Sequence, residues 1–161
     1  KRVAERTTIR VVDAPAAPEA GVKSWESVVT EMTKSLYFTS VYESTGSAIA
    51  ASAAFQLRDK IEKQTIDKGE YLARVNKVVA ETEKRRSKAK NQKDQPPALP
   101  FLVKALVESG TARVAYGSSS SLTAAVVAYE LRQEIMSDRI GKEQFIPLVK
   151  LINALINGTL R

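Results

Sequence analysis

The chain has 161 residues and matches itself when it is shifted by 74 residues, so that residues 23–80 lie on residues 97–154 without a gap. Identical pairs include Val29 and Val103, Ser35 and Ser109, Tyr42 and Tyr116, Ser47 and Ser121, Leu57 and Leu131, Arg58 and Arg132, Ile66 and Ile140, and Val75 and Val149. An internal repeat constrains the architecture because each copy must form the same structural unit. The match runs through loops as well as apolar stretches, which favours a duplication over two amphipathic stretches that share a phase by accident.

Each copy predicts three helical segments. The first has apolar residues at i, i+3, i+4 and i+7 from Trp25 onward, with Ser24 as its N-cap, and its counterpart is expected to end at Ser109 and Gly110. The second follows the hydroxyl-rich stretches 43–47 and 117–121. We therefore expect an all-α fold, a helical bundle of two duplicated three-helix units.

The third segment of the first copy begins at Asp67, whose spacing to Glu70 is typical of a capping box. In the second copy this segment ends at Asn157 and Gly158, and Pro147 either sets its first turn or kinks it. The predicted organisation is an extended N-terminal arm over 1–22, helical repeat 1 over 23–80, a basic helix extension and linker over 81–96, and helical repeat 2 over 97–161.

Two apolar features are expected to lack a partner within one small bundle. One is the small-residue helix face over 50–54, and the other is formed by Ile9, Val11 and Val12 of the arm. Symmetric or helical assemblies commonly bury such faces. We therefore predict self-association or association with a paralogous subunit.

The composition excludes several functional classes. Hydrophobic residues make up 43% of the chain, and only 7 Gly and 6 Pro interrupt it, which favours helices. Cys and His are both absent, so disulfides, zinc sites, haem ligation by His and Ser-His or Cys-His catalytic pairs are excluded. The carboxylates lie mostly beside Lys or Arg on expected helix surfaces, and none is in a clearly apolar setting, so we predict no enzyme activity and no cofactor.

No apolar run approaches the roughly 20 residues that span a bilayer, and no hydrophobic segment typical of a signal peptide is visible. We therefore predict no membrane span.

Positive charge is concentrated in one segment. The net charge is +7, and six cations without an intervening acid lie between positions 84 and 93. They are Lys84, Arg85, Arg86, Lys88, Lys90 and Lys93. Such a cluster favours a polyanionic partner and predicts sequence-independent binding to the phosphate backbone of nucleic acid. The alternative is a solvated helix end.

Three weaker features of the sequence are also compatible with binding of a polyanion. Arg58 and Arg132 are equivalent residues that could grip a symmetric polyanion, although a surface ion pair between Arg58 and Glu62 is the alternative. The serine-rich helix starts could bind phosphate, yet N-capping explains them and they lack the spacing of a P-loop. The five tyrosines could stack on bases, or pack in the core or an interface.

The apolar C-terminal stretch from Phe145 to Gly158 resembles the C-terminal helix of major capsid proteins from archaeal filamentous and rod-shaped viruses. The layout of an arm before a helical bundle is also similar. By residue, the resemblance covers less than a fifth of the chain. It implies a structural protein that coats double-stranded DNA in a helical virion, where adjacent subunits bury their apolar faces. The expected location is then a virion, and otherwise the cytoplasm.

Three functions remain open at this point. The first is a non-enzymatic structural protein that coats nucleic acid in a helical assembly. The second is a helical small subunit of a ribonucleoprotein complex such as a CRISPR effector. The third is a helical protein–protein interaction module that binds no nucleic acid. Co-purified nucleic acid and its strandedness would separate them.

Overall fold

The computed structural model describes residues 24–86 and 96–159. The first half of the chain contains α2 (Trp25–Lys34), α3 (Leu36–Thr45), α4 (Ala48–Gln56), α5 (Arg58–Glu62) and α6 (Lys68–Arg85). The second half contains α7 (Leu99–Glu108), α8 (Gly110–Ser119), α9 (Leu122–Glu130), α10 (Arg132–Met136) and α11 (Lys142–Asn157). Within these ranges there is no strand, so the predicted all-α class is confirmed. The predicted arm lies outside the described residues.

Each half has five helices in its described part, so the expectation of three was too low. The extra helices arise because Ser35 and Ser109 each start a new helix, with their hydroxyls accepting from the backbone N–H groups of Tyr37 at 3.1 Å and Ala112 at 3.2 Å. Gly110 is therefore the first residue of α8 and not a left-handed cap of α7. The chain also bends at Leu57 and Leu131, which divide the predicted second segment into two helices.

Other predicted helix ends are found where the sequence placed them. Ser24 accepts a hydrogen bond from the Ser27 N–H at 3.2 Å, and Asp67 accepts one from the Glu70 N–H at 2.8 Å. At the other end of the chain, Gly158 caps α11 in the left-handed conformation. Pro147 lies inside α11.

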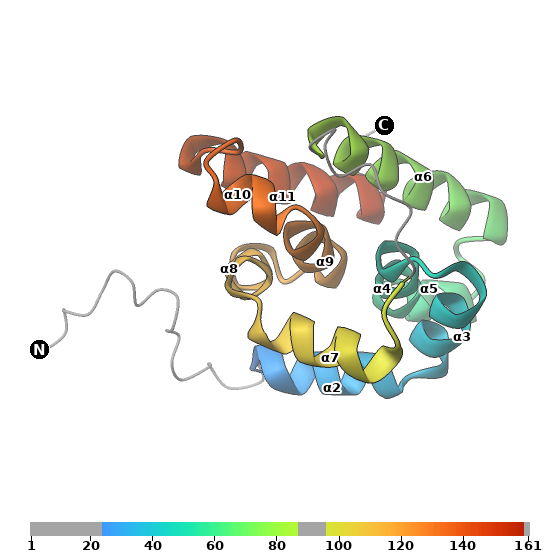
Figure 1. Cartoon of the computed structure of the whole chain (residues 1–161). Helices are drawn as coiled ribbons and strands as arrows, with labels where there is room; N and C mark the ends of the chain where they lie inside the picture. Colours follow the sequence, from blue (N-terminus) through green and yellow to red (C-terminus); the bar gives the residue numbers. More distant parts are fainter. Residues whose placement is uncertain (1–23, 87–95, 160–161) are drawn as a thin grey trace, which may run out of the picture.

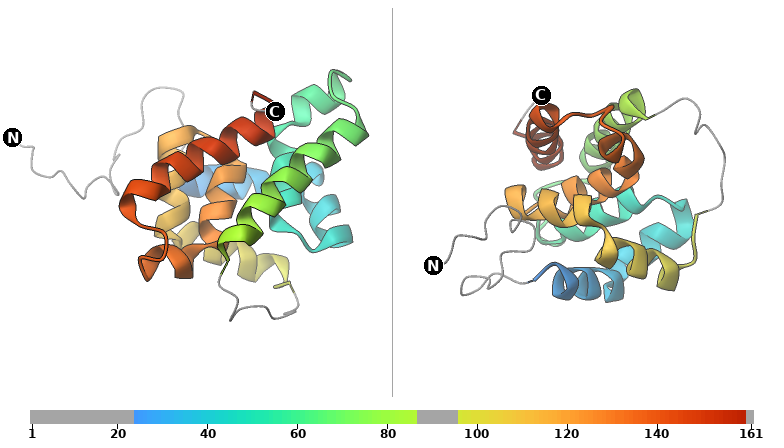
Figure 2. Two further views of the ribbon diagram at one scale, coloured as in Figure 1. Left: turned by 90° about the horizontal axis from the view of Figure 1, so that it is seen from above. Right: turned by 60° about the vertical axis from the view of Figure 1, so that its left-hand side comes forward.

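Three pairs of helices at equivalent sequence positions lie next to each other (Figure 1). In that view α2 and α7 form the lower layer, α4 and α9 pack together in the middle, and α6 and α11 form the upper layer. The view from above shows α6 and α11 running side by side in opposite directions (Figure 2). Helices α3 and α8 cover opposite sides of the middle layer.

The small-residue face of α4 is buried within the chain, contrary to the expectation that it lacks a partner. Every residue from Ala48 to Phe55 is buried, and α4 packs against α9, α3 and α6. Short side chains allow a close approach of α4 and α9, where the hydroxyls of Ser52 and Thr123 lie 3.4 Å apart. This face therefore gives no support to self-association, and Ile9, Val11 and Val12 lie outside the described residues.

Polar groups of one half complete helix ends of the other. The Gln56 side-chain oxygen accepts from the Thr123 N–H at 2.9 Å at the start of α9, and the Trp25 indole donates to the Leu106 carbonyl at 2.8 Å. Arg74 of α6 donates to the Ile156 carbonyl at 3.1 Å, near the end of α11. One hydrophobic core contains buried residues from both halves.

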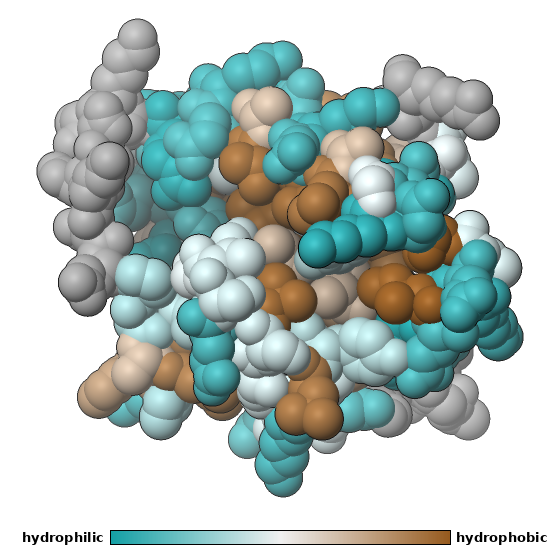
Figure 3. All heavy atoms as spheres, turned by 90° about the vertical axis from the view of Figure 1, so that its right-hand side faces the viewer, coloured by the Kyte–Doolittle hydropathy of each residue, from teal (hydrophilic) through white to brown (hydrophobic). Residues whose placement is uncertain are grey.

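Apolar side chains reach the surface in several places on the face that includes α3 and α6 (Figure 3). Leu36 of α3 is 79% exposed and Leu72 of α6 is 42% exposed. Of the helices that the structure describes, none combines the length and apolar character needed to cross a membrane.

Candidate nucleic-acid interface

The predicted basic segment begins in the last turn of α6, where each described cation has a carboxylate partner. Lys84 and Arg85 share Glu81, at N–O distances of 3.1 and 2.7 Å. Arg86 pairs with Glu83 at 3.3 Å and with Glu130 at 3.2 Å. The Glu130 contact links the end of α6 to the end of α9.

These ion pairs change the charge of the helix end. Hydrogen bonds from Arg85 and Lys84 lower the pKa of the Glu81 carboxyl, so it stays ionised at neutral pH. Three cations here face three carboxylates, and most of the local charge is balanced. Lys84 is still accessible, with 64% of its side chain exposed. The remaining predicted cations, Lys88, Lys90 and Lys93, lie outside the described residues.

A cation that the sequence analysis missed lies near this helix end. Arg85 and Arg139 line the same surface hollow of about 390 Å³, together with Glu143 and Gln144. Arg139 is exposed and forms no ion pair with any described carboxylate. It lies in the turn between α10 and α11, so only the tertiary fold brings it to Arg85. No local sequence pattern predicts that these two arginines line the same hollow.

Arg58 and Arg132 occupy matching environments within the fold. The Arg58 guanidinium lies 3.8 Å from the centroid of the Phe55 ring and donates to the Phe55 carbonyl at 2.7 Å. The Arg132 guanidinium lies 4.2 Å from the centroid of the Tyr129 ring and donates to the Tyr129 carbonyl at 2.8 Å. Neither shares a carboxylate partner with the α6 cations.

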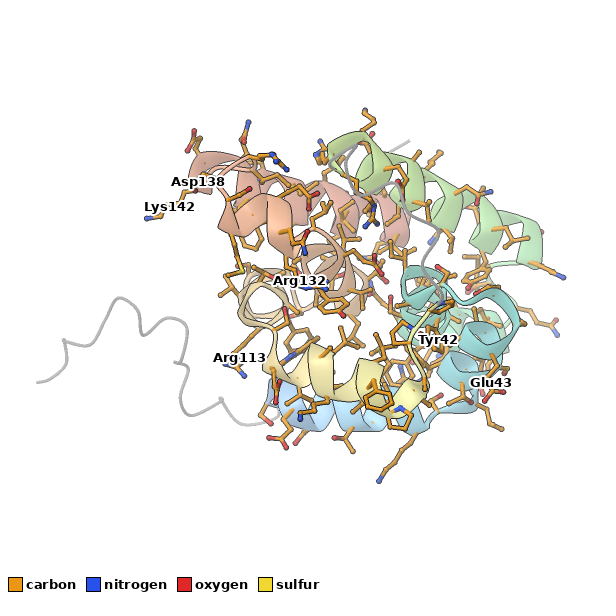
Figure 4. All side chains as sticks on the ribbon, viewed as in Figure 1. Tyr42, Glu43, Arg113, Arg132, Asp138 and Lys142 are labelled. Atoms are coloured by element: carbon orange, nitrogen blue, oxygen red, sulfur yellow. The ribbon has the colours of Figure 1, made fainter. Side chains whose placement is uncertain are left out.

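The alternative ion pair between Arg58 and Glu62 is absent from this described part of the fold. Glu62 instead accepts a hydrogen bond from the Tyr37 hydroxyl at 2.7 Å. Figure 4 shows Arg132 toward the middle of the molecule, while Asp138 and Lys142 lie at the outer corner where α10 meets α11.

The serines and tyrosines are engaged in internal contacts. Ser47 and Ser121 accept from backbone N–H groups as N-caps, while the Ser118 hydroxyl donates to a carbonyl within α8 at 3.0 Å. The Tyr42 hydroxyl donates to the Pro97 carbonyl at 2.6 Å, and the Tyr71 hydroxyl donates to the Ala50 carbonyl at 2.7 Å. These contacts favour capping and packing over binding of phosphate or bases.

The acidic residues include one buried position that the sequence analysis placed on a helix surface. Glu134 of α10 is 2% exposed. A single acidic residue in a five-residue helix gives no periodic signal from which burial could be predicted. Among residues 24–86 and 96–159, no group of three or more potential metal ligands gathers at one place.

Comparison with known proteins adds no relative. No family model matches the chain, and neither a curated protein nor a solved structure is significantly similar to it. The candidate interface therefore consists of the described cations at the end of α6, with Arg139 beside them.

Proposed function

We propose that the protein is a non-enzymatic structural protein that binds nucleic acid through its phosphate backbone and coats it in a helical assembly. The observation that carries the proposal is the acid-free run of six cations from Lys84 to Lys93, which begins at a helix end on the surface. Cations held close together repel each other, and a polyanion relieves that repulsion. The archaeal capsid resemblance of the C-terminal helix fits the same role.

The residues of the interface have different roles in this proposal. Lys84, Lys88, Lys90 and Lys93 bind phosphates, and Arg139 adds a cation from the second half. Arg85 and Arg86 mainly hold the end of α6, since their guanidinium groups already meet Glu81 and Glu130. Arg58 and Arg132, stacked on their own neighbouring rings, contribute to the fold more than to phosphate binding.

The test replaces Lys84, Lys88, Lys90 and Lys93 together by Gln and measures binding to a mixed-sequence DNA duplex over a range of salt concentrations. For duplex DNA the logarithm of the binding constant falls by about 0.9 per tenfold rise in salt for each phosphate neutralised. Loss of three to four contacts should flatten that slope by about 3. Two unrelated duplex sequences should bind the parent protein almost equally, because no base-reading helix is apparent.

A matched control removes the same charge elsewhere. Lys34, Lys60, Lys63 and Lys68 are exposed, and their replacement by Gln lowers the net charge equally. This control should keep the slope of the parent. If the control flattens the slope as strongly as the test variant, binding reflects net charge alone, and if neither variant changes it, the basic segment is only a solvated linker.

A helical interaction module without nucleic acid is the second candidate. It is favoured by the ion pairs of Lys84, Arg85 and Arg86, which reduce the charge available at the described helix end. Absence of duplex and single-strand binding at 50 mM salt would favour this candidate. Binding to single-stranded RNA alone would favour a ribonucleoprotein subunit.

We also propose that the chain is an internal duplication whose halves are related by a pseudo-two-fold axis. Its support is the 74-residue offset, the matching positions of the helix starts and the side-by-side packing of α2 with α7, α4 with α9 and α6 with α11. In an experimental structure, residues 23–80 should superpose on residues 97–154 by a rotation close to half a turn. Equivalent helices pointing in unrelated directions would contradict it.

A further inference from the structure

The second half contains an apolar pocket at positions where the first half carries a different set of side chains. The pocket has a volume of about 640 Å³ and is lined by residues of α7, α8, α9, α10 and α11. Its wall includes Gly110, Thr111, Tyr129, Arg132, Met136 and Phe145. This volume lies within the range of about 300–1,000 Å³ that is usual for small-molecule sites.

Two residues of the first half that align with pocket-lining residues contact each other. Tyr37 corresponds to Thr111 and Glu62 corresponds to Met136, and the Tyr37 hydroxyl donates from α3 to Glu62 of α5 at 2.7 Å. The hydrogen bond to Glu62 raises the pKa of the phenol, while the nearby Arg58 charge acts in the opposite direction. An aromatic ring with a polar tip therefore bridges these two helices near Arg58, the residue equivalent to Arg132.

In the second half the corresponding residues are shorter or apolar. Thr111 donates to the Ala128 carbonyl at 3.0 Å, and Met136 stands in place of Glu62. The bridge of the phenol to the carboxylate is therefore missing in the second half, where the pocket lies.

One charged group of the wall is fixed in position. The Arg132 guanidinium is held by the Tyr129 ring at 4.2 Å and by a hydrogen bond to the Tyr129 carbonyl at 2.8 Å. An arginine has five N–H donors, so most of them are left for a ligand. Because the guanidinium is already immobilised, it can bind a carboxylate with little further loss of side-chain entropy.

The only carboxylate in the described wall of the pocket belongs to Glu108. Glu108 is exposed at the end of α7, so water screens its charge. The Arg132 side chain is half-buried beside apolar side chains, where its charge is screened less. An anionic group on a ligand is therefore favoured next to Arg132.

We propose that this pocket binds a small aromatic carboxylate, with its ring between α8 and α10, at the positions that Tyr37 and Glu62 bridge in the first half, and its carboxylate on Arg132. The ring packs against Phe145, Ile135 and Val114, which line the pocket. This proposal is independent of nucleic-acid binding, since none of the three described cations at the end of α6, Lys84, Arg85 and Arg86, lines the pocket.

The test titrates the full chain with 2-naphthoate and, separately, with the neutral analogue 2-naphthol, using calorimetry or NMR shifts. A hydrogen bond to a charged group contributes about 1.5–3 kcal/mol, which is roughly a 10- to 150-fold change in affinity. Arg132→Gln should therefore weaken 2-naphthoate binding at least 10-fold and change 2-naphthol binding less than 3-fold. The matched variant Arg58→Gln should leave both affinities unchanged.

Closing the pocket provides a second readout. Thr111→Tyr places the residue of the first half in the wall of the pocket. It should abolish binding of both compounds while the thermal unfolding temperature stays within a few degrees of the parent. The proposal is overturned if the parent shows no saturable binding at millimolar 2-naphthoate, if Thr111→Tyr binds as tightly as the parent, or if Arg132→Gln affects the two compounds equally.

Discussion

Two glycines of the described fold, Gly46 and Gly117, have opposite effects on stability, although no sequence motif distinguishes them. Gly46 caps α3 with φ at +71°, and a Cβ atom there would lie 2.7 Å from Cγ of Pro96. Gly117 lies inside α8, and a Cβ atom there would meet nothing within 4 Å. Of these two glycines, the fold requires Gly46 and tolerates a side chain at Gly117.

Alanine at these two positions should therefore change stability in opposite directions. Gly117→Ala should raise the free energy of unfolding by about 0.5–1 kcal/mol, because alanine loses less backbone entropy in a helix. Gly46→Ala should lower it by at least about 1 kcal/mol, because left-handed backbone is unfavourable with a Cβ atom and Pro96 must move. Urea unfolding measures both, and an equal effect of the two substitutions would contradict this account.

Stability at high pH should depend on Tyr71. Burial raises the pKa of its phenol to about 12 from 10.0. Above pH 10 the unfolded chain loses this proton while the folded chain keeps it, so stability falls as the pH rises from about 10 to about 12. Tyr71→Phe should be less stable at pH 8, by about 1 kcal/mol for the lost hydrogen bond to Ala50, yet its stability should fall less over pH 10–12. Equal slopes for both proteins would show that other groups dominate.

At the scale of helices, local signals predicted some helix ends but missed the starts at Ser35 and Ser109, the bends at Leu57 and Leu131 and the contacts that depend on distant residues. Ser24, Asp67 and Gly158 act through neighbours within a few residues, so the sequence showed them. Arg74 at the end of α11 and Gln56 at the start of α9 act across the fold, and no local pattern marks such contacts.

The candidate sites likewise combine features visible in the local sequence with features that only the tertiary fold creates. The cations of α6 were visible as a run, but the Glu130 partner of Arg86 and the nearby Arg139 required the tertiary fold. The open pocket needs five helices to form, yet one signal was present in the alignment of the halves. Gly110 and Thr111 stand where the first half has the larger Leu36 and Tyr37.

Helix α11 carries a proline where its counterpart α6 has alanine. Pro147 is the sixth residue of α11 and is exposed, and Ala73 is the sixth residue of α6. Pro147 removes the N–H that would bond to the Glu143 carbonyl. Pro147→Ala should stabilise the protein by about 2 kcal/mol, since the helical cost of proline is about 3 kcal/mol and proline also restricts the unfolded chain.

The matched reverse substitution is Ala73→Pro, which should destabilise the protein by about 3 kcal/mol because it breaks a hydrogen bond inside α6. Circular dichroism at 222 nm during urea unfolding reports both changes. A destabilised Pro147→Ala variant would mean that the proline is needed for the packing of α11.

On the scale of the whole molecule, the two halves share one core and should unfold together. Trp25 is the only tryptophan, and it joins α2 to α7 through the Leu106 carbonyl and lies 5.4 Å from the Tyr116 ring, between centroids. Its fluorescence therefore reports the contact between halves in the lower layer. Circular dichroism reports all helices at once, so the two probes should give the same unfolding midpoint if the molecule is a single cooperative unit.

A substitution at Ile152 of α11 tests most directly whether the molecule unfolds as one unit. Ile152 is fully buried, and α11 belongs to the upper layer, on the other side of the middle layer from α2 and its Trp25. Ile152→Ala should lower the free energy of unfolding by about 2–5 kcal/mol, from lost burial and the cavity left behind. In one cooperative unit, the Trp25 fluorescence midpoint must shift by as much as the midpoint from circular dichroism. A Trp25 midpoint that stays in place while circular dichroism becomes biphasic would show that the layers unfold separately, and the shared core would then stabilise each layer only locally.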